Sequence, residues 1–456
     1  MSPLLALLLA GCPESAKRVD SPADTGADTS AGTGADTSAD TGADTGDDTA
    51  ADSADTSADT ADTSADTDLD GTADDEDCAP TDASRYPGAD ELPCDGIDQD
   101  CDGLDSTGVS FLDGAGAKTD LSATFAAGTA ASPVAYTLTQ DGTLTFCAGT
   151  WYTQLTSEAA ELTVDSVDGA ATTILDAGGS GAVLTSALDY AALAVTGLTL
   201  TGGSGTNGGA LAISGVDSRL DVSAATLSGN TAAYGAAIYF ASGLYTISDS
   251  TFSANTATSD GAGLYTGTLA WGTVAGSSFD GNVAGLNGGG IAIGGVAYDS
   301  SPWLTVTTSS FTNNSATSGG GIYTYYPVIR VESSTISGNT AAYGGGVYTN
   351  YNSSYILDTE IFDNSAAYGG GIFGYWGTTA VVCATAGGVW GNTASTSGGG
   401  AYINYFGGVS SDNCEWGSGA DDNVADDVYL AWAFASEAGY GSGATFTCSG
   451  SMGYCY

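Results

Sequence analysis

Three stretches of the chain decide its fold. Residues 310–323 read SFTNNSATSGGGIY, residues 335–348 read TISGNTAAYGGGVY, and residues 360–373 read EIFDNSAAYGGGIF. Each stretch has an asparagine at its fifth position and ends in a glycine triplet followed by an aliphatic and an aromatic residue. The stretches begin 25 residues apart, and a fixed period of this length is the sequence signature of a repeat architecture.

The same pattern covers much of the chain on either side of these stretches. Successive repeated asparagines are separated by 25, 27, 32, 25, 25, 28 and 31 residues. Apolar residues recur ten, eight and three positions before the asparagine, as in Leu304, Val306 and Phe311. Alternation of this kind is typical of short strands that bury one face. The repeated asparagines are Asn230, Asn255, Asn282, Asn314, Asn339, Asn364, Asn392 and, in a degenerate copy, Asn423.

Coils of 25 to 32 residues, each with three short strands, cannot bury their apolar faces alone. Stacked coils can, so the sequence predicts an all-β fold, a parallel β-helix. The asparagines should then form a ladder of side-chain amides about 4.8 Å apart. A β-propeller is excluded because its blades need roughly 40 or more residues. We expect an N-terminal cap over residues 107–145, coils over 146–430 and a C-terminal cap over 431–456.

The repeats also resemble a known family. The F-x-x-N and G-G-A-[ILV] repeats of the polymorphic outer-membrane proteins are matched over about residues 197–430, and earlier segments are similar to the first coils of pectate-lyase-like β-helices. The resemblance implies a right-handed β-helix, and several members of that family are adhesive. The matching segments are Phe252–Asn255, Phe279–Asn282, Phe311–Asn314 and Gly208–Leu211, and upstream 147–152, 171–176 and 197–201.

The N-terminus reads MSPLLALLLAGC. Its apolar run is far too short to span a bilayer of ~30 Å as a helix. It resembles a bacterial lipoprotein signal, which implies a signal peptide over residues 1–11, acylation of Cys12 and a lipid anchor in the outer membrane or at the cell surface. The first three residues lack the Lys or Arg that export signals normally carry. The alternatives are an ordinary secretory signal, in which case the protein is secreted, and a chance apolar start.

Residues 12–67 are predicted to form a disordered tether. Residues 23–67 repeat Ala-Asp-Thr with inserted Ser and Gly, and they contain no Leu, Ile, Val or aromatic residue. Such a composition cannot bury enough apolar surface to offset the entropy of ordering.

Residues 68–106 form an acidic module with three cysteines. Alternate aspartates on a tight loop supply the oxygen ligands that Ca²⁺ prefers. The string PGADE…CDGIDQDCDG resembles the "putative metal-binding motif" family, named after a copper-binding member, and also thrombospondin type 3 calcium repeats. The module has no His or Met, so calcium is favoured over copper, and the alternative is a disulfide-stapled hinge without an ion. The candidate ligands are Asp98, Asp100, Asp102 and Asp105, with a weaker copy at Asp68, Asp70 and Asp74.

A lipid anchor implies export, so disulfides become permissible for the cysteines. If Cys12 is acylated, eight thiols remain, which could form four disulfides. Cys383 and Cys414 each lie nine residues before a repeated asparagine, which places them in adjacent coils and predicts a disulfide. Near the C-terminus we expect Cys448 to pair with Cys455. The connectivity of the others, Cys78, Cys94, Cys101 and Cys147, stays open.

Charge and composition exclude several functions. The chain has a formal net charge of −48 and no histidine. It therefore has neither the cations that neutralise nucleic-acid phosphates nor a Ser-His-Asp triad. The two basic residues of the coils, Arg219 and Arg330, each have an acidic residue two positions on, which predicts surface ion pairs. The outward column nine before the asparagines contains no cluster of carboxylates, so catalysis is not predicted.

Aromatic residues follow the inward aliphatic residue of most coils. Alternation along a strand places these columns on the surface. One interpretation is that the rings stabilise neighbouring coils by cross-strand pairing. The other is that flat rings bind sugars, with tyrosine hydroxyls adding hydrogen bonds. The candidate ligand-binding residues are Tyr239, Tyr265, Tyr323, Tyr348, Phe373 and Tyr402, with Trp271 and Trp303 in a second column.

We therefore predict a lipid-anchored β-helix scaffold of the cell surface that binds glycans or is adhesive. Its partners would be the membrane, through an N-terminal lipid, and a polysaccharide or surface protein. The alternatives are a polysaccharide lyase or glycoside hydrolase, and a purely structural envelope or matrix protein.

Overall fold

The structure is a computed structural model that describes residues 65–89, 94, 97–101, 108–294, 302–351, 353–384, 387–405, 407–417, 422–438, 448–451 and 454–455. The predicted signal peptide, Cys12 and most of the tether lie outside the described residues. Residues 64–456 belong to one compact unit. Its described part consists of strands and one short helix, α1 (Ser122–Ala126).

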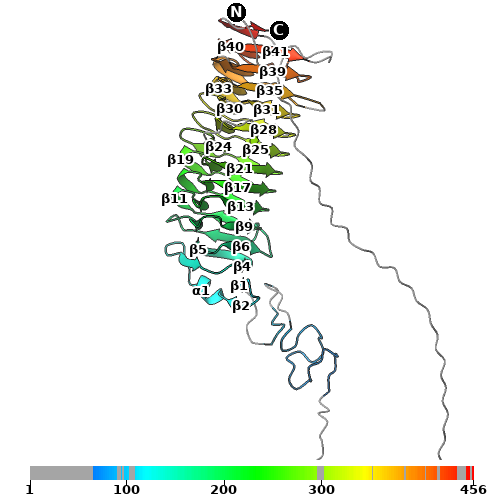
Figure 1. Ribbon diagram of the computed structural model, residues 1–456. Coiled ribbons are helices and arrows are strands. Elements are labelled where there is room, and N and C mark those ends of the chain that lie inside the picture. Colours follow the sequence, from blue (N-terminus) through cyan, green and yellow to red (C-terminus); the bar gives the residue numbers. More distant parts are fainter. Residues whose placement is uncertain are drawn as a thin grey trace, which may run out of the picture. The chain divides into compact units, whose positions relative to one another are not determined.

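The strands wind through three parallel sheets in turn. In one coil, β17 (Gly243–Ser248) lies in the first sheet, β18 (Thr251–Ser253) in the second and β20 (Leu264–Thr266) in the third. The next strand, β21 (Ala270–Ala275), returns to the first sheet and pairs in parallel with β17. Figure 1 shows these strands stacked coil upon coil. The predicted all-β fold with parallel stacked coils is confirmed.

Most of the remaining strands belong to one of these three sheets. The second and third sheets share the long strand β5 (Gly149–Ser157). The first sheet also contains β2 (Lys118–Asp120), β1 (Val109–Asp113), β4 (Gly142–Phe146), β6 (Glu161–Ser166), β9 (Ala192–Thr196), β13 (Ser218–Ser223), β25 (Pro302–Thr307), β28 (Val328–Glu332), β31 (Ser354–Leu357), β35 (Thr378–Val382), β39 (Gly408–Asp412), β41 (Phe434–Ala438) and β43 (Tyr454–Cys455). The second contains β7 (Thr173–Asp176), β10 (Thr199–Thr201), β14 (Thr226–Ser228), β22 (Ser278–Asp280), β26 (Ser310–Thr312), β29 (Thr335–Ser337), β32 (Glu360–Phe362) and β36 (Gly388–Trp390). The third contains β3 (Val134–Leu138), β8 (Leu184–Ser186), β12 (Leu211–Ile213), β16 (Ile238–Phe240), β24 (Ile291–Gly294), β27 (Ile322–Tyr325), β30 (Val347–Asn350), β34 (Ile372–Tyr375), β38 (Ala401–Asn404), β40 (Val428–Ala431) and β42 (Cys448–Ser451).

Short strands between the second and third sheets complete some coils. They pair in parallel in two small sheets. These strands are β11 (Ser204–Asn207), β15 (Thr231–Tyr234), β19 (Thr256–Asp260) and β23 (Val283–Ala284), and separately β33 (Ser365–Tyr368) and β37 (Thr393–Ser397).

The predicted inward columns form the core. Phe252, Phe279 and Phe311 lie on adjacent strands of the second sheet and are fully buried. Their rings stack with centroids 4.4 and 4.8 Å apart. Burial of such a side chain contributes ~1.5–3 kcal/mol relative to exposure.

An antiparallel cap covers the open edge of the first sheet at its N-terminal end. Strand β1 pairs antiparallel with both β4 and β2. Helix α1 inserts Phe125 between Tyr136 and Phe146, with each ring centroid 5.2 Å away. An unpaired sheet edge is a template for pairing with other chains, and this cap covers the edge of β4. At the C-terminal end, β42 and β43 continue the parallel sheets beyond residue 430.

The asparagine ladder that the sequence predicts is present. Each repeated asparagine from Asn230 to Asn392 donates a side-chain hydrogen bond of 2.9–3.1 Å to the Oδ1 atom of the next one. The same Oδ1 atom accepts the backbone N–H of the donating residue, as between Asn339 and Asn364 at 2.9 Å. At its end, the Nδ2 atom of Asn423 donates to the buried carboxylate of Asp427 at 3.0 Å.

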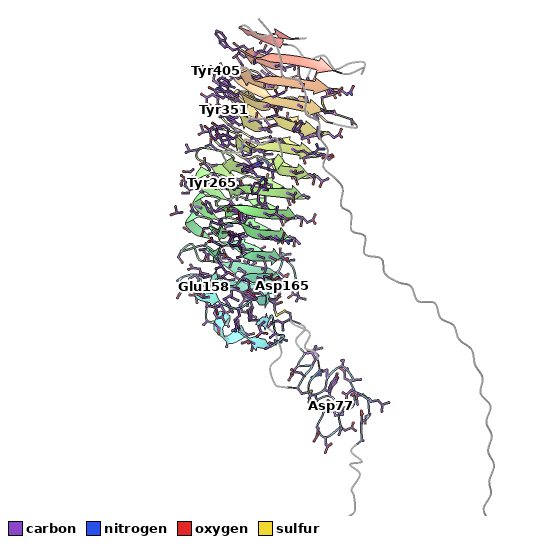
Figure 2. All side chains as sticks on the ribbon, in the orientation of Figure 1. Asp77, Glu158, Asp165, Tyr265, Tyr351 and Tyr405 are labelled. Atoms are coloured by element: carbon purple, nitrogen blue, oxygen red, sulfur yellow. A yellow bond between two sulfur atoms is a disulfide. The ribbon has the colours of Figure 1, made fainter. Side chains whose placement is uncertain are left out.

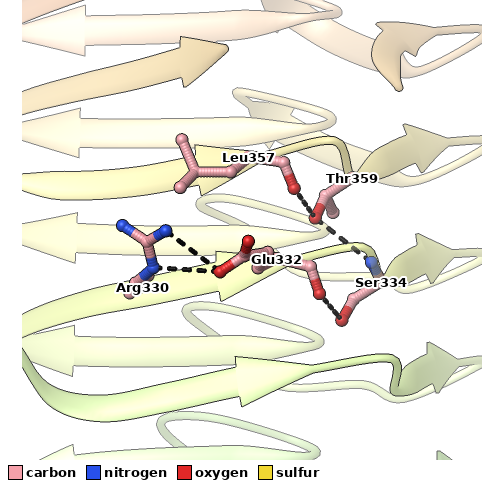
Figure 3. Close-up of polar contacts among 5 residues, drawn as sticks. All are labelled: Arg330, Glu332, Ser334, Leu357 and Thr359. Carbon is pink, nitrogen blue, oxygen red and sulfur yellow. Dashed lines mark hydrogen bonds and ion pairs between the residues drawn. The ribbon is translucent and has the colours of Figure 1, made fainter. Parts of the chain in front are cut away.

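A second ladder of hydroxyl groups runs along the turn between the first and second sheets, and the sequence analysis missed it. The Oγ atom of Ser334 accepts the backbone N–H of Ser309 at 3.1 Å and donates to the carbonyl of Glu332 at 2.8 Å. Thr359 repeats both contacts one coil further on, as Figure 3 shows. The signal was a Ser or Thr five residues before the asparagine in successive repeats. The ladder consists of Ser250, Ser277, Ser309, Ser334 and Thr359.

The glycine triplets make the turn before the third sheet tight. Gly344 has a φ of +65°, a conformation that residues with a side chain rarely adopt. A Cβ atom on Gly345 would overlap the carbonyl oxygen of Gly370 in the next coil. Close packing of the stacked coils therefore requires glycine at these positions.

The predicted disulfide between Cys383 and Cys414 is confirmed, with a Cα–Cα distance of 5.0 Å. Both cysteines follow strands of the first sheet and are buried. The predicted pair of Cys448 and Cys455 stays a prediction, because the side chains of both lie outside the described residues.

The structure also resolves the four cysteines whose pairing was open. Cys78 bonds to Cys101 and closes the acidic module. Cys94 bonds to Cys147, which directly follows β4, so a covalent link ties the module to the beginning of the coils.

Candidate functional site

Three aspartates at the start of the acidic module form a candidate metal site. The carboxylate oxygens of Asp66, Asp68 and Asp70 lie within 4.8 Å of one another. Hydrogen bonds shape the loop: Asp66 accepts the backbone N–H of Leu69 at 2.7 Å and of Gly71 at 3.2 Å. Gly71 has a φ of +101°, which suits glycine at this sharp turn.

The donor atoms of this loop fit a hard cation. The Oδ2 atoms of Asp68 and Asp70 are buried and have no hydrogen-bond partner. Burial, and then repulsion from Asp70, raise the pKa of Asp68. Calcium takes six to eight oxygen ligands, and buried carboxylate oxygens without partners beside a third carboxylate provide part of such a shell.

The spacing in this loop is that of an EF-hand, which the sequence analysis missed. Asp66, Asp68 and Asp70 stand at the first, third and fifth positions, with Gly71 at the sixth and Asp77 at the twelfth, where an EF-hand has Glu. The predicted tether ended at residue 67, so Asp66 was assigned to the tether and separated from Asp68 and Asp70.

Asp74, predicted as a ligand, lies outside the three-carboxylate group. Its two oxygens each accept a hydrogen bond of 2.7 Å from Thr67, one from the backbone and one from the hydroxyl. It stands at the ninth loop position, which an EF-hand often fills through a water molecule. Here Asp74 closes the loop.

The second predicted aspartate loop is described only in part. Asp98 and Asp100 are described, whereas Asp102 and Asp105 lie outside the described residues. This segment packs on the rest of the module, because Tyr86 donates its backbone N–H to the carbonyl of Gln99 at 2.8 Å.

Aromatic residues of the third sheet stack along the coils. This set, which we call the sheet column, has centroid distances of 4.9–5.2 Å and interplanar angles of 6–22°. Tyr239 and Tyr265 form a separate stack at 5.6 Å, and Ala292 interrupts the series. The pairing interpretation is thus supported. The sheet column consists of Tyr323, Tyr348, Phe373, Tyr402 and Tyr429.

The expectation that all these candidates are exposed is wrong for two of them. Phe373 is only 5% exposed, because Tyr348 and Tyr402 cover its two faces and Tyr343 contacts it edge-on. Trp303 is 3% exposed and lies 5.0 Å from the ring of Trp271. Alternation does point these side chains away from the core, but neighbouring rings then cover Phe373, and Trp303 packs against Trp271.

Burial changes the acidity of the tyrosines in the sheet column. It raises the pKa of Tyr348 to about 12, with smaller contributions from neighbouring tyrosines, of which Tyr375 comes first. Burial, and then Tyr348, also raise the pKa of Tyr323. These hydroxyls are therefore neutral hydrogen-bond donors and acceptors at physiological pH.

A further row of aromatic residues, the turn row, was not found from the sequence. Each member is the first residue after a strand of the third sheet. Period-two alternation assigns faces only to residues within strands, so it could not place these positions. Figure 2 labels two of them, Tyr351 and Tyr405. The turn row consists of Tyr326, Tyr351, Trp376, Tyr405 and Trp432.

The first sheet carries a hollow of about 430 Å³ near its N-terminal end, lined by both polar and apolar residues. It lies where the small residue Ala192 separates Glu161 from Arg219, and Ala194 separates Thr163 from Asp221. Arg219 contacts Asp221 at 2.7 Å. The corresponding contact between Arg330 and Glu332, at 3.0 Å, is shown in Figure 3, so both predicted ion pairs are confirmed. Asp141 also lines the hollow.

Two protein families match parts of the chain. Residues 77–106 match the "Putative metal-binding motif". Residues 308–325 match the Chlamydia polymorphic membrane protein repeat. No curated protein and no solved structure matches the chain.

The first match covers residues 77–106 of the module and so begins after Asp66, Asp68 and Asp70, and the second covers part of one coil. Together with the disulfides, the two matches fit an exported protein of the outer surface that is built as a β-helix scaffold. In the described part of the chain, no helix has the length and apolar character needed to cross a membrane.

Proposed function

We propose that this protein is a lipid-anchored β-helix scaffold of the cell surface that binds glycans along the aromatic side of its third sheet. The observation that carries the proposal is the continuous series of stacked rings from Tyr323 to Tyr429, one per coil. The series bears several hydroxyl groups and repeats at the spacing of the coils. Rings with an apolar body and a polar edge are suited to sugars, which present both apolar faces and hydroxyls.

The overall charge supports a glycan rather than a polyanion. With 54 acidic and 6 basic residues, the chain repels nucleic acids and acidic polymers. A protein ligand is the principal rival, and failure to bind every glycan in the panel described below would favour it.

The acidic module would hold a structural calcium ion. Asp66, Asp68 and Asp70 would supply carboxylate oxygens, and the ion would fix a loop that has little apolar core of its own. The module would then form a rigid joint between the tether and the coils, with the Cys94–Cys147 bond as its second attachment.

Two experiments test this function. The purified full chain is presented with a panel of neutral and acidic polysaccharides, and we expect retention on neutral ones only. Absence of binding to every glycan would refute glycan binding. Separately, Cys12→Ser should release the protein from membranes, and a variant that still partitions into detergent would refute acylation at Cys12.

The hollow on the first sheet supports a second candidate, cleavage of a polysaccharide. Asp141, Glu161 and Asp221 line it, and glycoside hydrolysis requires two carboxyl groups. Incubation with neutral and uronate-containing polysaccharides, with and without Ca²⁺, tests it. Release of reducing sugar that is lost in Glu161→Gln would establish an enzyme, and its absence would leave the binding scaffold.

A further inference from the structure

The turn row occupies a backbone conformation that aromatic residues rarely adopt. Tyr326, Tyr351, Trp376, Tyr405 and Trp432 have φ values of +73°, +67°, +60°, +46° and +63°. In this left-handed region the Cβ atom crowds the backbone, so glycine and asparagine are favoured, and bulky residues there are outliers that commonly mark functional sites.

The other turns of the same coils provide an internal comparison. Between the first and second sheets, the left-handed position is held by small residues such as Ala224, Asp249, Thr308, Ser333 and Asp358. Before the third sheet it is held by glycine, as at Gly319, Gly344 and Gly369. Large rings therefore recur at this position only in the turn that follows the third sheet, among the turns that the structure describes.

Backbone hydrogen bonds hold the turn row in place. The N–H of Tyr351 donates to the carbonyl of Tyr375 in the next coil at 2.8 Å, and that of Tyr405 donates to Ala431 at 3.1 Å. The backbone hydrogen bonds between neighbouring coils thus continue through this turn, whatever side chain is present. Main-chain pairing in this turn therefore does not require an aromatic residue.

In the turn row, Tyr326 and Tyr351 stack closely, with centroids 4.7 Å apart, whereas the rings from Tyr351 to Tyr405 are parallel but only partly overlapped. Tyr351, Trp376 and Tyr405 have interplanar angles of 15° and 5°, with centroids 6.2 and 6.1 Å apart. These separations exceed the coil spacing of about 4.8 Å, so the rings are offset and each leaves part of a face uncovered. From Tyr351 to Trp432, the four residues are between 41% and 53% exposed. The sheet column, by contrast, is half-buried or buried.

The surroundings of the turn row are uncharged. Residues 322–328, 347–357, 372–383 and 401–411 contain no Asp, Glu, Lys or Arg, in a chain whose net charge is −48. Tyr325 and Tyr375 lie beside the row and add hydroxyl groups. A neutral, hydroxyl-rich ligand is favoured over an ionic one by this composition.

We propose that the turn row is the principal glycan-binding site and takes one chain of a neutral polysaccharide, which runs along the stack with about one sugar ring for each coil. This inference rests on the proposed function. The row contributes one ring per coil, and the coil spacing of about 4.8 Å is close to the length of one pyranose in an extended chain. Their offset faces present the apolar surface on which a sugar ring stacks. Trp376 and Trp432 supply the largest faces.

The test replaces Tyr351, Trp376 and Tyr405 together by asparagine, which tolerates the left-handed conformation. In the full chain, we expect affinity for the neutral polysaccharide that wild type retains to fall on the order of tenfold or more, since surface aromatics concentrate binding energy. The thermal unfolding transition should be unchanged or higher. The matched control is Ser333→Asn, at the left-handed position of another turn, which should alter neither.

A second measurement needs no triple variant. In wild type, the bound polysaccharide should protect tryptophan fluorescence from acrylamide quenching, and Trp376→Phe should reduce that protection. Unprotected fluorescence in saturated wild type would overturn the site.

The remaining outcomes are distinct. If wild type binds a glycan and the asparagine variant binds it equally, the turn row is not the site, and the proposed function stands. If wild type binds no glycan, both proposals fall. Self-association of wild type that is abolished in the asparagine variant would assign the row to a second copy of the chain and overturn the inference.

Discussion

The side-chain amide of Asn364 donates a hydrogen bond of 2.9 Å to the Oδ1 atom of Asn392, and the same oxygen accepts the backbone N–H of Asn364 at 3.0 Å. The second amide hydrogen of Asn364 reaches the carbonyl of Ile336 at 2.9 Å. Both residues are fully buried. Each asparagine therefore satisfies its own polar groups and those of its neighbours, so the ladder specifies the register of the coils.

Replacement of Asn364 by alanine should destabilise the coils by roughly 2–3 kcal/mol, because partners on Asn339 and Asn392 lose hydrogen bonds while they remain buried. Chemical denaturation followed by circular dichroism measures this. Asn207→Ala, at an exposed asparagine, is the control and should be near neutral. Equal stability of the two variants would contradict the role of the ladder.

The hydroxyl ladder predicts a difference between two substitutions of one residue. Ser334→Ala removes the acceptor of the Ser309 N–H and should cost about 1–2 kcal/mol. Ser334→Thr should be tolerated, because Thr359 makes the same contacts one coil away. Thermal melts of both variants test this, and an alanine variant as stable as the threonine variant would show that the hydroxyl is dispensable.

The elevated pKa of Tyr348 predicts alkaline destabilisation. Burial first, and then neighbouring tyrosines, raise its pKa from 10.0 to about 12 in the folded chain. The folded state holds the proton more tightly, so stability is fully present below pH 10 and is lost as the pH rises towards 12. Melting temperatures between pH 8 and 11.5 should fall less steeply in Tyr348→Phe than in wild type. Parallel curves would contradict the assignment.

The loop that contains Asp66, Asp68 and Asp70 predicts that the chain binds calcium there. Isothermal titration of the full chain with Ca²⁺ should give a binding isotherm that Asp68→Asn weakens strongly, because one of three clustered carboxylates is lost. Asp82→Asn is the control, since Asp82 contacts Ser84 away from the loop. Chelation should make residues 65–101 sensitive to protease and leave the coils intact. A wild-type chain that binds no Ca²⁺ would refute the ion.

The columns around Asn314, Asn339 and Asn364 could be predicted because each coil repeats the same inward and turn positions. An irregular residue in one coil is therefore outweighed by the equivalent residues in the others. Cys383 and Cys414 could be paired for the same reason. The Cys94–Cys147 bond could not, since it joins a unique module to a unique strand and no repeat constrains it.

The candidate sites were harder to predict than the coils. The burial of Phe373 depends on the rings of Tyr343, Tyr348 and Tyr402, and a rule of alternation carries no information about such neighbours. The hydroxyl ladder was hidden because Ser and Thr are abundant throughout the chain. Tyr326, Tyr351 and Trp376 of the turn row lie twelve residues after repeated asparagines, but only the structure gives their left-handed backbone conformation.

The central claim is that the aromatic side of the stack is an extended binding surface for neutral glycan. It is tested most directly by titration of the full chain with neutral oligosaccharides of increasing length. Tyr351, Trp376, Tyr405 and Trp432 lie on consecutive coils, so affinity should rise with each added sugar until the chain spans these coils and then level off. Affinity that is absent at every length, or that is the same for a disaccharide and a hexasaccharide, would contradict the claim.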